Sequence, residues 1–242
     1  MKAVILVGGA GTRLRPLTYV VPKCLLPVGG KPLLERTMKY LEGHGITEFV
    51  LCVAYLKKQI IDAFGDGSRY GFRIEYAEAD SPLGTAGQLK TASGLVDGTF
   101  LVMNGDIITT LSVTNLVATH KKKGGVATIA LKEFGVKIPY GHVSFDSGGR
   151  VTAFEEKPTL NYMANAGVYV MEPRVLDSIP SNKVSSLETE VFPRLIAKGE
   201  VVNSYYEAAY WADVGSLDDF ERVNNEANND PSLILPPTPD RP

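Results

Sequence analysis

The chain has 242 residues, of which 44% are hydrophobic and 21% are charged. Both fractions are ordinary for a soluble globular protein, and a chain of this length can bury a core of its own. Lysine and arginine number 25 against 27 aspartates and glutamates, so the formal net charge is -2. This balance argues against whole-surface attraction to nucleic acid or to an anionic membrane, although a net sum can conceal a local basic pocket.

Cysteine is scarce, with only Cys24 and Cys52 and no C-x-x-C spacing. This usage argues against both a disulfide scaffold and a zinc ribbon. The apolar run at 3–7 stops at Gly8, which is too short for a signal-peptide core, and no run approaches the roughly 18 apolar residues of a membrane span. We therefore expect a reduced, cytoplasmic protein without a membrane or nucleic-acid partner.

The first half of the chain alternates between strand and helix patterns. Residues 3–7 are continuously apolar, as is typical of a strand buried on both faces of a parallel sheet. Further patterns predict strands at 49–54, 73–79 and 99–103 and helices at 33–42, 57–64 and 85–95. This alternation predicts an α/β fold, a Rossmann-like mixed but mainly parallel sheet flanked by helices.

After about residue 110 the pattern is less regular. Lys121–Lys123 reads as the solvated end of a helix, and later patterns predict strands at 126–132, 142–146, 150–155, 166–171 and 201–206 and helices at 186–198 and 217–228. No Ser/Gly-rich linker and no fixed-period repeat divides the chain. We therefore expect a single domain over 1–229 and a Pro-rich tail at 230–242 that is extended or disordered.

The first strand leads into a glycine-rich loop, Gly8-Gly9-Ala10-Gly11-Thr12-Arg13-Leu14-Arg15-Pro16. Ligands bind at the carboxyl edge of such sheets, where glycines let backbone N–H groups approach an anion and arginines add positive charge. A glycine-rich turn with solvated arginines is the alternative. The loop is no Walker A motif, because no Lys-Ser/Thr pair follows Gly11, and no dinucleotide fingerprint, because Leu14 stands where a glycine is required.

Lys23 follows in the segment Val21-Pro22-Lys23-Cys24-Leu25-Leu26-Pro27-Val28. Prolines and apolar neighbours hold this lysine on a stiff stretch of chain. It either points at phosphate beside the glycine loop or is an ordinary surface lysine.

At this point the sequence resembles a known family. GGAGTRLRPLT at 8–18 and PKCLLPVGGKPLLE at 22–35 resemble the signature of the sugar-nucleotide pyrophosphorylases, or sugar-1-phosphate nucleotidyltransferases. Later motifs extend the resemblance over most of the chain. It implies catalytic roles for Arg13, Lys23 and Asp106, and nucleotide binding by Leu6, Gly8, Gly9, Gly11, Thr12 and Arg13.

A second small-residue turn, Leu83-Gly84-Thr85-Ala86-Gly87, precedes a predicted helix. Such a turn suits close approach to a flat base or an anion, or is simply a helix start. In the family the matching segment faces the nucleobase, and the Gly-Thr-Ala-Gly form is most similar to guanylyl- and some uridylyl-transferring members. The resemblance thus implies nucleotide contacts at Glu78, Pro82, Gly84, Thr85 and Asn104.

Two aspartates follow predicted buried segments. Asp106, in Asn104-Gly105-Asp106, is placed either to bind Mg²⁺ or to form an Asx turn. Asp213, in Trp211-Ala212-Asp213-Val214-Gly215, could also belong to a helix-cap region behind a core tryptophan. Both stretches resemble metal-binding motifs of the family, which implies that Asp106 and Asp213 converge on a Mg²⁺ ion.

The remaining motifs are Tyr140-Gly141, Glu155-Glu156-Lys157-Pro158 and Asn165-Ala166-Gly167. Paired carboxylates could serve general acid–base chemistry or merely mark a charged strand edge. The resemblance implies instead that these segments bind the sugar phosphate, through Gly141, Glu156, Lys157, Asn165 and Gly167, with Glu188 at a further sugar-side position.

The implied reaction is Mg²⁺-dependent transfer of a nucleoside monophosphate from an NTP to a sugar 1-phosphate, with release of pyrophosphate. GTP with mannose 1-phosphate is the expected substrate pair, and UTP or dTTP with glucose 1-phosphate is the alternative. A non-catalytic sugar-nucleotide sensor or regulatory subunit is the alternative of a different class. Family members are often oligomers, but the sequence carries no decisive interface signal, so a homo-oligomer is left open.

Overall fold

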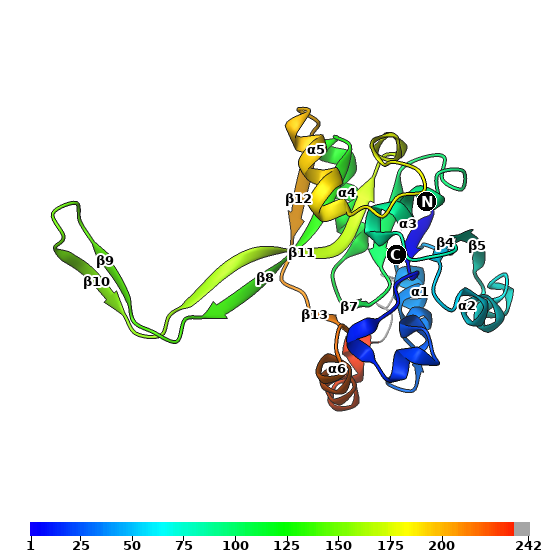
Figure 1. Ribbon diagram of the computed structural model, residues 1–242, viewed down its shortest axis with the longest axis horizontal. Helices are drawn as coiled ribbons and strands as arrows, with labels where there is room; N and C mark the ends of the chain where they lie inside the picture. Colours follow the sequence, from blue (N-terminus) through cyan, green and yellow to red (C-terminus); the bar gives the residue numbers. More distant parts are fainter. Residues whose placement is uncertain (235–242) are drawn as a thin grey trace, which may run out of the picture.

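The computed structural model describes residues 1–234. A seven-stranded sheet forms its centre, with the strand order β12 (Val202–Tyr206), β8 (Ala127–Lys137), β11 (Thr159–Met171), β6 (Phe100–Asn104), β1 (Ala3–Leu6), β4 (Glu48–Val53) and β5 (Arg73–Glu78) (Figure 1). Strands β6, β1, β4 and β5 run parallel, whereas β11 is antiparallel to both β6 and β8. The predicted mixed, mainly parallel sheet is confirmed.

The sheet lies between two layers of helices, each with its own apolar core. On one face pack α1 (Leu33–Gly43), α2 (Lys57–Phe64) and α4 (Val113–Lys123), and on the other α3 (Gly84–Thr91) and α5 (Phe192–Ala197). Strand β1 serves both cores, since Ala3 and Ile5 pack on the first face and Val4 and Leu6 on the second. This two-sided burial explains the unbroken apolar run in the sequence.

A third, smaller cluster joins the end of the chain to this body. It packs α6 (Leu217–Asn229) against β2 (Pro27–Val28) and β13 (Trp211–Asp213). Strand β2 pairs with β3 (Lys31–Pro32), and β13 pairs antiparallel with β7 (Ile107–Thr109). Within residues 1–234, no helix combines the length and the apolar character that crossing a bilayer would require.

The register of the parallel strands decides where the loops meet. Leu6 at the end of β1 lies opposite Cys52 of β4 on one side and Asn104 of β6 on the other. The glycine-rich loop after β1 and the turn after β6 therefore leave the sheet at the same edge, which is where ligands bind in folds of this type.

Strands β8 and β11 continue beyond the body as a two-stranded ribbon, and β9 (His142–Phe145) pairs with β10 (Val151–Glu155) at its far end (Figure 1). We call residues 132–164 the arm. The strands predicted at 142–146 and 150–155 are confirmed as β9 and β10, but those predicted at 126–132 and 166–171 are longer in the structure, as β8 and β11. The prediction stopped short because the added residues mix polar and exposed apolar side chains, so they lack the pattern of a buried strand.

Two predictions near the end of the chain need correction. The helix expected at 186–198 is divided into a π-helical turn over Leu187–Val191 and α5, where Pro193 lacks the N–H that would continue a regular helix. The tail was expected to be extended or disordered, but Pro231–Ile234 forms a 3₁₀ helix whose Ile234 carbonyl accepts a hydrogen bond from Arg36 (3.2 Å). Residues 235–242 lie outside the described part of the chain.

Gly84 offers a direct test of this packing. Its φ is +72°, and a Cβ at this position would collide with the Ser185 carbonyl oxygen. Because strain and steric overlap add, we predict that Gly84→Ala lowers the free energy of unfolding by about 2–4 kcal/mol, as measured by urea denaturation. Gly94→Ala is the matched control, since a Cβ there meets nothing within 4 Å. An equal effect of the two substitutions would contradict the packing described.

Candidate active site

A cavity of about 290 Å³ opens at the edge of the sheet where β1 and β6 end. The loop after β1, the start of α3, the turn after β6 and the segment before α6 all contribute to its wall. Its lining comprises Leu6, Val7, Gly9, Gly11, Thr12, Arg13, Lys23, Cys24, Thr85, Gln88, Asn104, Gly105, Asp106 and Gly215. Most of the residues predicted to bind the nucleotide or to act in catalysis therefore converge on one cavity.

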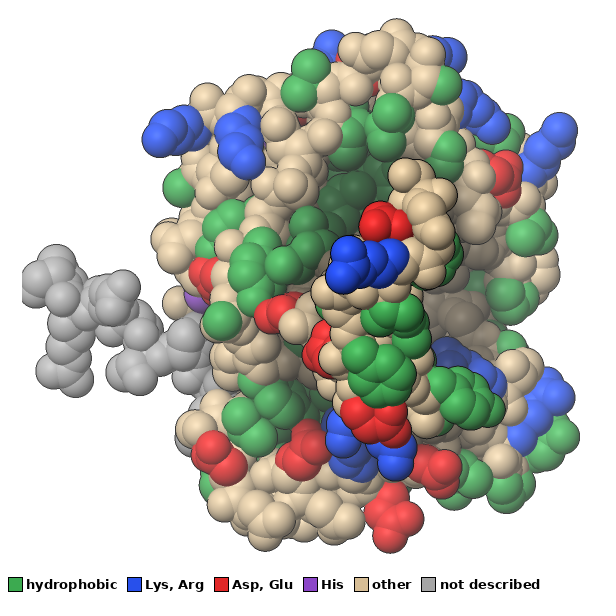
Figure 2. All heavy atoms as spheres, turned by 90° about the vertical axis from the view of Figure 1, so that its left-hand side faces the viewer, with side chains coloured by type: hydrophobic (Ala, Val, Ile, Leu, Met, Phe, Trp, Pro, Cys, Tyr) green, Lys and Arg blue, Asp and Glu red, His purple; other side chains and the backbone are tan. Residues whose placement is uncertain are grey.

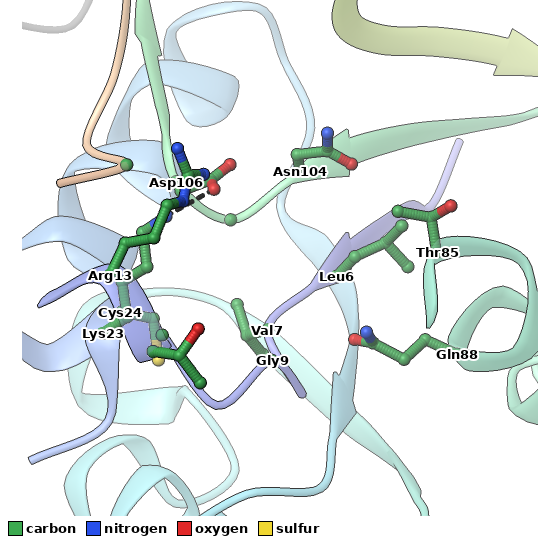
Figure 3. A pocket seen from close by; sticks show the side chains of 14 residues that line it. Leu6, Val7, Gly9, Arg13, Lys23, Cys24, Thr85, Gln88, Asn104 and Asp106 are labelled. Atoms are coloured by element: carbon green, nitrogen blue, oxygen red, sulfur yellow. Dashed lines mark hydrogen bonds and ion pairs between the residues drawn. The ribbon is translucent and has the colours of Figure 1, made fainter. Parts of the chain in front are cut away.

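The charged groups gather on one side of this cavity. Lys23, on a 3₁₀ helix over Lys23–Leu25, donates a hydrogen bond and forms an ion pair from Nζ to Asp106 Oδ2 at 2.5 Å. Figure 3 shows Arg13 beside this pair, with Leu6, Thr85 and Gln88 on the opposite side. The site thus has a strongly charged half and a half formed by apolar and neutral polar groups.

The glycine loop presents Arg13 to the cavity. Gly11 has a φ of +58° and begins a 3₁₀ helix over Thr12–Leu14, whose Leu14 is fully buried. The Gly11 carbonyl also accepts a hydrogen bond from Thr18 Oγ1 (2.8 Å). These contacts fix the turn, so Arg13 is held by its backbone although its side chain is exposed.

Asp213 is positioned near Asp106 and Arg13 by the pairing of β13 with β7. It pairs with Ile107 across the β13–β7 ladder, and the N–H of Val214 donates to the carbonyl of Asp106 (2.8 Å). A Cβ added to Gly215 would lie 2.6 Å from Asp213 Oδ2 and 3.1 Å from Arg13 Nη1. The structure thus brings the two predicted metal ligands together, beside Arg13.

The donor set at this point suits a hard divalent cation. Asn104, which also lines the cavity, has a buried Oδ1 with no hydrogen-bond partner. Mg²⁺ prefers oxygen ligands and is commonly held by one or two carboxylates together with substrate phosphates. In the described residues no group of three or more His, Cys, Asp or Glu side chains is placed to hold a metal. The residues present therefore fit Mg²⁺ if phosphate and water complete the coordination.

Three predicted sugar-side residues lie in the body of the protein. Asn165 Nδ2 donates to Tyr169 Oη (2.7 Å), Tyr169 Oη donates to Glu188 Oε1 (3.2 Å), and Thr85 Oγ1 donates to Glu188 Oε2 (2.7 Å). Burial, with Glu188 as a further cause, raises the pKa of Tyr169, so its phenol stays protonated. Gly167 lies against Asn104, with a would-be Cβ 2.7 Å from Asn104 Nδ2. This network links the predicted sugar side to Thr85 of the cavity.

The other three sugar-side residues lie on the arm. A Cβ at Gly141 would be 3.0 Å from Glu156 Oε2, so these residues are neighbours, and both Glu156 and Lys157 are exposed. The ribbon pairs without interruption from Asn165 out to Thr159, a span of about 20 Å at the usual rise per residue. Lys157 lies beyond that point. The structure therefore divides the predicted sugar-phosphate set between the body and the arm.

Four predicted nucleotide-binding residues are not among those that line the cavity. The N–H of Gly8 donates to Gln88 Oε1 (2.8 Å), and Gly84 packs against Ser185 of the same chain. Glu78 forms an ion pair with Lys57 (3.2 Å), and Pro82 lies in an exposed loop. At Gly8 and Gly84 the missing side chain lets other residues of this chain, Gln88 and Ser185, approach the backbone closely. A nucleotide contact at these four positions stays a prediction.

Sequence reasoning missed four lining residues: Val7, Cys24, Gln88 and Gly215. Gln88 could have been found, because it stands three residues after Thr85 and so lies on the same face of the predicted helix. The segment around Gly105 was predicted to face the ligand, but the sequence does not reveal that this glycine lets the turn after β6 pass Val7 and the Leu6 carbonyl. Burial raises the pKa of the Cys24 thiol to about 12, which suits a packed side chain rather than a nucleophile.

Comparison with known proteins agrees with this geometry. The family model of the nucleotidyl transferases matches residues 2–230. The chain therefore belongs to the nucleotidyl transferase family, and the resemblance found in its motifs is confirmed at this level.

Individual relatives add detail. The chain is 40% identical over 228 residues to a mannose-1-phosphate guanylyltransferase of Mycobacterium tuberculosis, covering 92% of this chain and 63% of the relative. It is 36% identical over 241 residues to a UTP–glucose-1-phosphate uridylyltransferase of Synechocystis, covering 91% and 61%. The chain thus spans about three fifths of the length of these curated relatives.

A solved structure shares this fold. The HddC protein of Yersinia pseudotuberculosis, crystallised in complex with GMP-PN, superposes with a TM-score of 0.74 at 26% sequence identity. The superposition covers 93% of this chain and 98% of that one.

The contact between Gly8 and Gln88 gives a prediction for this site. Gln88→Leu leaves the buried N–H of Gly8 without an acceptor, so it lowers the free energy of unfolding by about 1–3 kcal/mol and weakens binding of a nucleoside triphosphate. Urea denaturation and titration calorimetry measure the two effects. Gln59→Leu, at an exposed hydrogen-bonding glutamine of α2, serves as control. If both variants behaved alike, the contact would not support the loop.

Proposed function

We propose that this chain transfers a nucleoside monophosphate from an NTP to a sugar 1-phosphate and releases pyrophosphate. The observation that carries the proposal is the meeting of Arg13, Lys23 and Asp106 at one cavity, with Asp213 beside its wall through the pairing of β13 with β7 and its closeness to Gly215. Two of these side chains supply positive charge for phosphates and two supply carboxylates for a metal. A non-catalytic sensor needs no such complete set, and the relatives named above are nucleotidyltransferases.

The positive charges act on the nucleotide. Arg13 stabilises the triphosphate and the departing pyrophosphate, and Lys23 stabilises charge at the α-phosphate. Phosphoryl and nucleotidyl transfer is limited mainly by charge repulsion and alignment, which fixed positive charge and positioning reduce. Loss of one such preorganised group costs about 10²–10³ in rate in comparable cases.

Asp106 and Asp213 are the residues that would hold Mg²⁺. When bound, the ion neutralises charge on the phosphate oxygens and orients them. The unpartnered oxygen of Asn104 belongs to a residue that lines the same cavity. The two carboxylates would leave the remaining coordination positions to phosphate and water, as is usual for Mg²⁺ in nucleotide sites.

The sugar phosphate needs no general base. Its phosphate oxygen is already anionic when it attacks the α-phosphorus, so a new P–O bond forms as the bond to the bridging oxygen of pyrophosphate breaks, and no proton moves. Asn165 and Glu188 offer amide and carboxylate groups to sugar hydroxyls, while Glu156 and Lys157 belong to the arm. Lys157 is the cation assigned to the incoming phosphate.

GTP and mannose 1-phosphate are the substrate pair we propose. Support comes from the guanylyltransferase relative and from the Gly84-Thr85-Ala86-Gly87 segment, with Thr85 and Gln88 on the neutral side of the cavity. UTP with glucose 1-phosphate is the second candidate, favoured by the similarity to the uridylyltransferase.

A substrate panel tests this proposal. Pyrophosphate release is measured with GTP, UTP, dTTP, ATP and CTP, each combined with mannose 1-phosphate and glucose 1-phosphate, with Mg²⁺ present. We expect turnover with a sugar 1-phosphate and the highest kcat/KM for GTP with mannose 1-phosphate. Release with UTP and glucose 1-phosphate instead would reverse the substrate choice. No release with any pair, from protein that binds an NTP, would favour a sugar-nucleotide sensor.

A further inference from the structure

The arm is a ribbon with one apolar face. Tyr162 lies opposite Phe134 and Leu160 lies opposite Val136 in the β11–β8 ladder, so these four side chains share one face. Phe134, Leu160 and Tyr162 are exposed. The other face carries Glu133, Gly135, Lys137, Thr159, Asn161 and the exposed Met163, so it is mainly polar and the ribbon is amphipathic.

This face has no cover in the described part of the chain. Of the large hydrophobic side chains exposed in residues 1–234, half belong to the arm, and Phe134, Leu160 and Tyr162 of this face are among them. Figure 2, which views the molecule from the arm's end, shows hydrophobic and charged groups of the arm in front of the hollowed body. A two-stranded ribbon is marginal in water unless its apolar face is packed. A contiguous exposed apolar surface marks an interaction site.

The chain's own body is a poor cover for the arm. The ladder runs without a register shift from Thr159–Lys137 to Asn165–Leu131, and the irregularity lies only between Asn165 and Tyr169. Folding the outer arm back would break these cross-strand pairs. While they hold, Lys157 stays more than about 20 Å from Asn165, farther than one hexose 1-phosphate reaches.

The inner end of the apolar face lies next to the strand that carries Asp213. Lys132 Nζ sits 3.3 Å from the centre of the Trp211 ring and 5.3 Å from that of Phe134. Trp211 is two residues from Asp213 on the same strand. A cavity of about 260 Å³ opens here, lined in part by Lys132, Glu133, Ala166, Tyr206 and Trp211. Whatever covers the arm's apolar face therefore arrives beside Asp213.

We propose that a second copy of this chain covers the arm, and that the two arms are exchanged so that each copy's Glu156 and Lys157 complete the other copy's sugar-phosphate site. Two ribbons packed antiparallel, apolar face to apolar face, bring the outer end of each to the base of the other. This is a self-complementary contact that closes with two-fold symmetry. It places Lys157 of one copy near Trp211 and Asp213 of the second copy, which neither arm achieves within its own chain.

The inference rests on the proposed function, because it assigns Lys157 to the incoming phosphate, and a complementation experiment separates the two. Lys157→Ala and Asp106→Asn chains carry different affinity tags, are co-expressed, and are purified over both tags to isolate mixed dimers. Each variant alone is expected to turn over at least about 100-fold more slowly than wild type. In a mixed dimer with exchanged arms, one site receives both intact residues and the other receives neither, so the dimer recovers about half of wild-type turnover.

Each other outcome has a separate meaning. Mixed dimers that remain as inactive as the single variants would overturn the exchange, as would failure to recover any mixed dimer. A chain carrying both substitutions, paired with itself, controls for contamination and must stay inactive. If the Lys157→Ala protein alone turned over at the wild-type rate, the proposed role of Lys157 would fall, whatever the assembly.

Substitution of the apolar face gives an independent readout. Leu160→Asp is expected to convert the dimer to a monomer in light scattering at micromolar concentration, and to raise KM for the sugar 1-phosphate more than tenfold while leaving NTP affinity within twofold. Asn161→Asp, on the opposite face of the same strand, is expected to leave both unchanged. A wild-type chain that is monomeric while fully active would overturn the proposal.

Discussion

The ion pair between Lys23 and Asp106 ties together two parts of the chain that only the parallel pairing of β1 and β6 brings close. Lys23 belongs to the segment after the first strand and Asp106 to the turn after β6, 83 residues later. The pair is partly buried, so removal of either charge would leave the other poorly compensated. Under the proposed function, a nucleotide phosphate in the cavity would compete with Asp106 for Lys23. The contact thus fixes the segment after β1 against the turn after β6.

The glycines of this site do not all have the role that the sequence motifs indicate. The motifs predict that a phosphate or a base approaches the backbone at each of these glycines. Gly9, Gly11 and Gly105 do line the cavity, but a Cβ at Gly11, Gly84 or Gly105 would also press against atoms of the chain itself. By letting α3 pack on Ser185 and the β6 turn pass Val7, Gly84 and Gly105 position Thr85 and Asp106. Much of what these glycines do is therefore architectural, because they set the positions of side chains that line the cavity.

The sequence allowed prediction of the elements whose burial leaves a local mark. The apolar run of β1 revealed a strand buried on both faces, and the motifs around Arg13, Lys23, Asp106 and Asp213 located one wall of the cavity. The lengths of β8 and β11 could not be read, because their outer pairs are exposed and depend on the partner strand. The contact of Ile234 with Arg36, 198 residues apart, likewise has no local signature. The separation of Lys157 from Asn165 follows from the ladder and not from their spacing in the sequence.

The central claim is that Asp106 and Asp213 together hold Mg²⁺ against the phosphates of a nucleotide. Titration calorimetry with a non-hydrolysable triphosphate of the accepted base, in Mg²⁺ and in EDTA, tests it most directly. The wild-type protein should bind at least about tenfold more tightly with Mg²⁺, Asp213→Asn should lose most of that difference, and Asp218→Asn, at an exposed position of α6, should keep it. An Asp213→Asn protein whose affinity still rises with Mg²⁺ as in wild type would contradict the account.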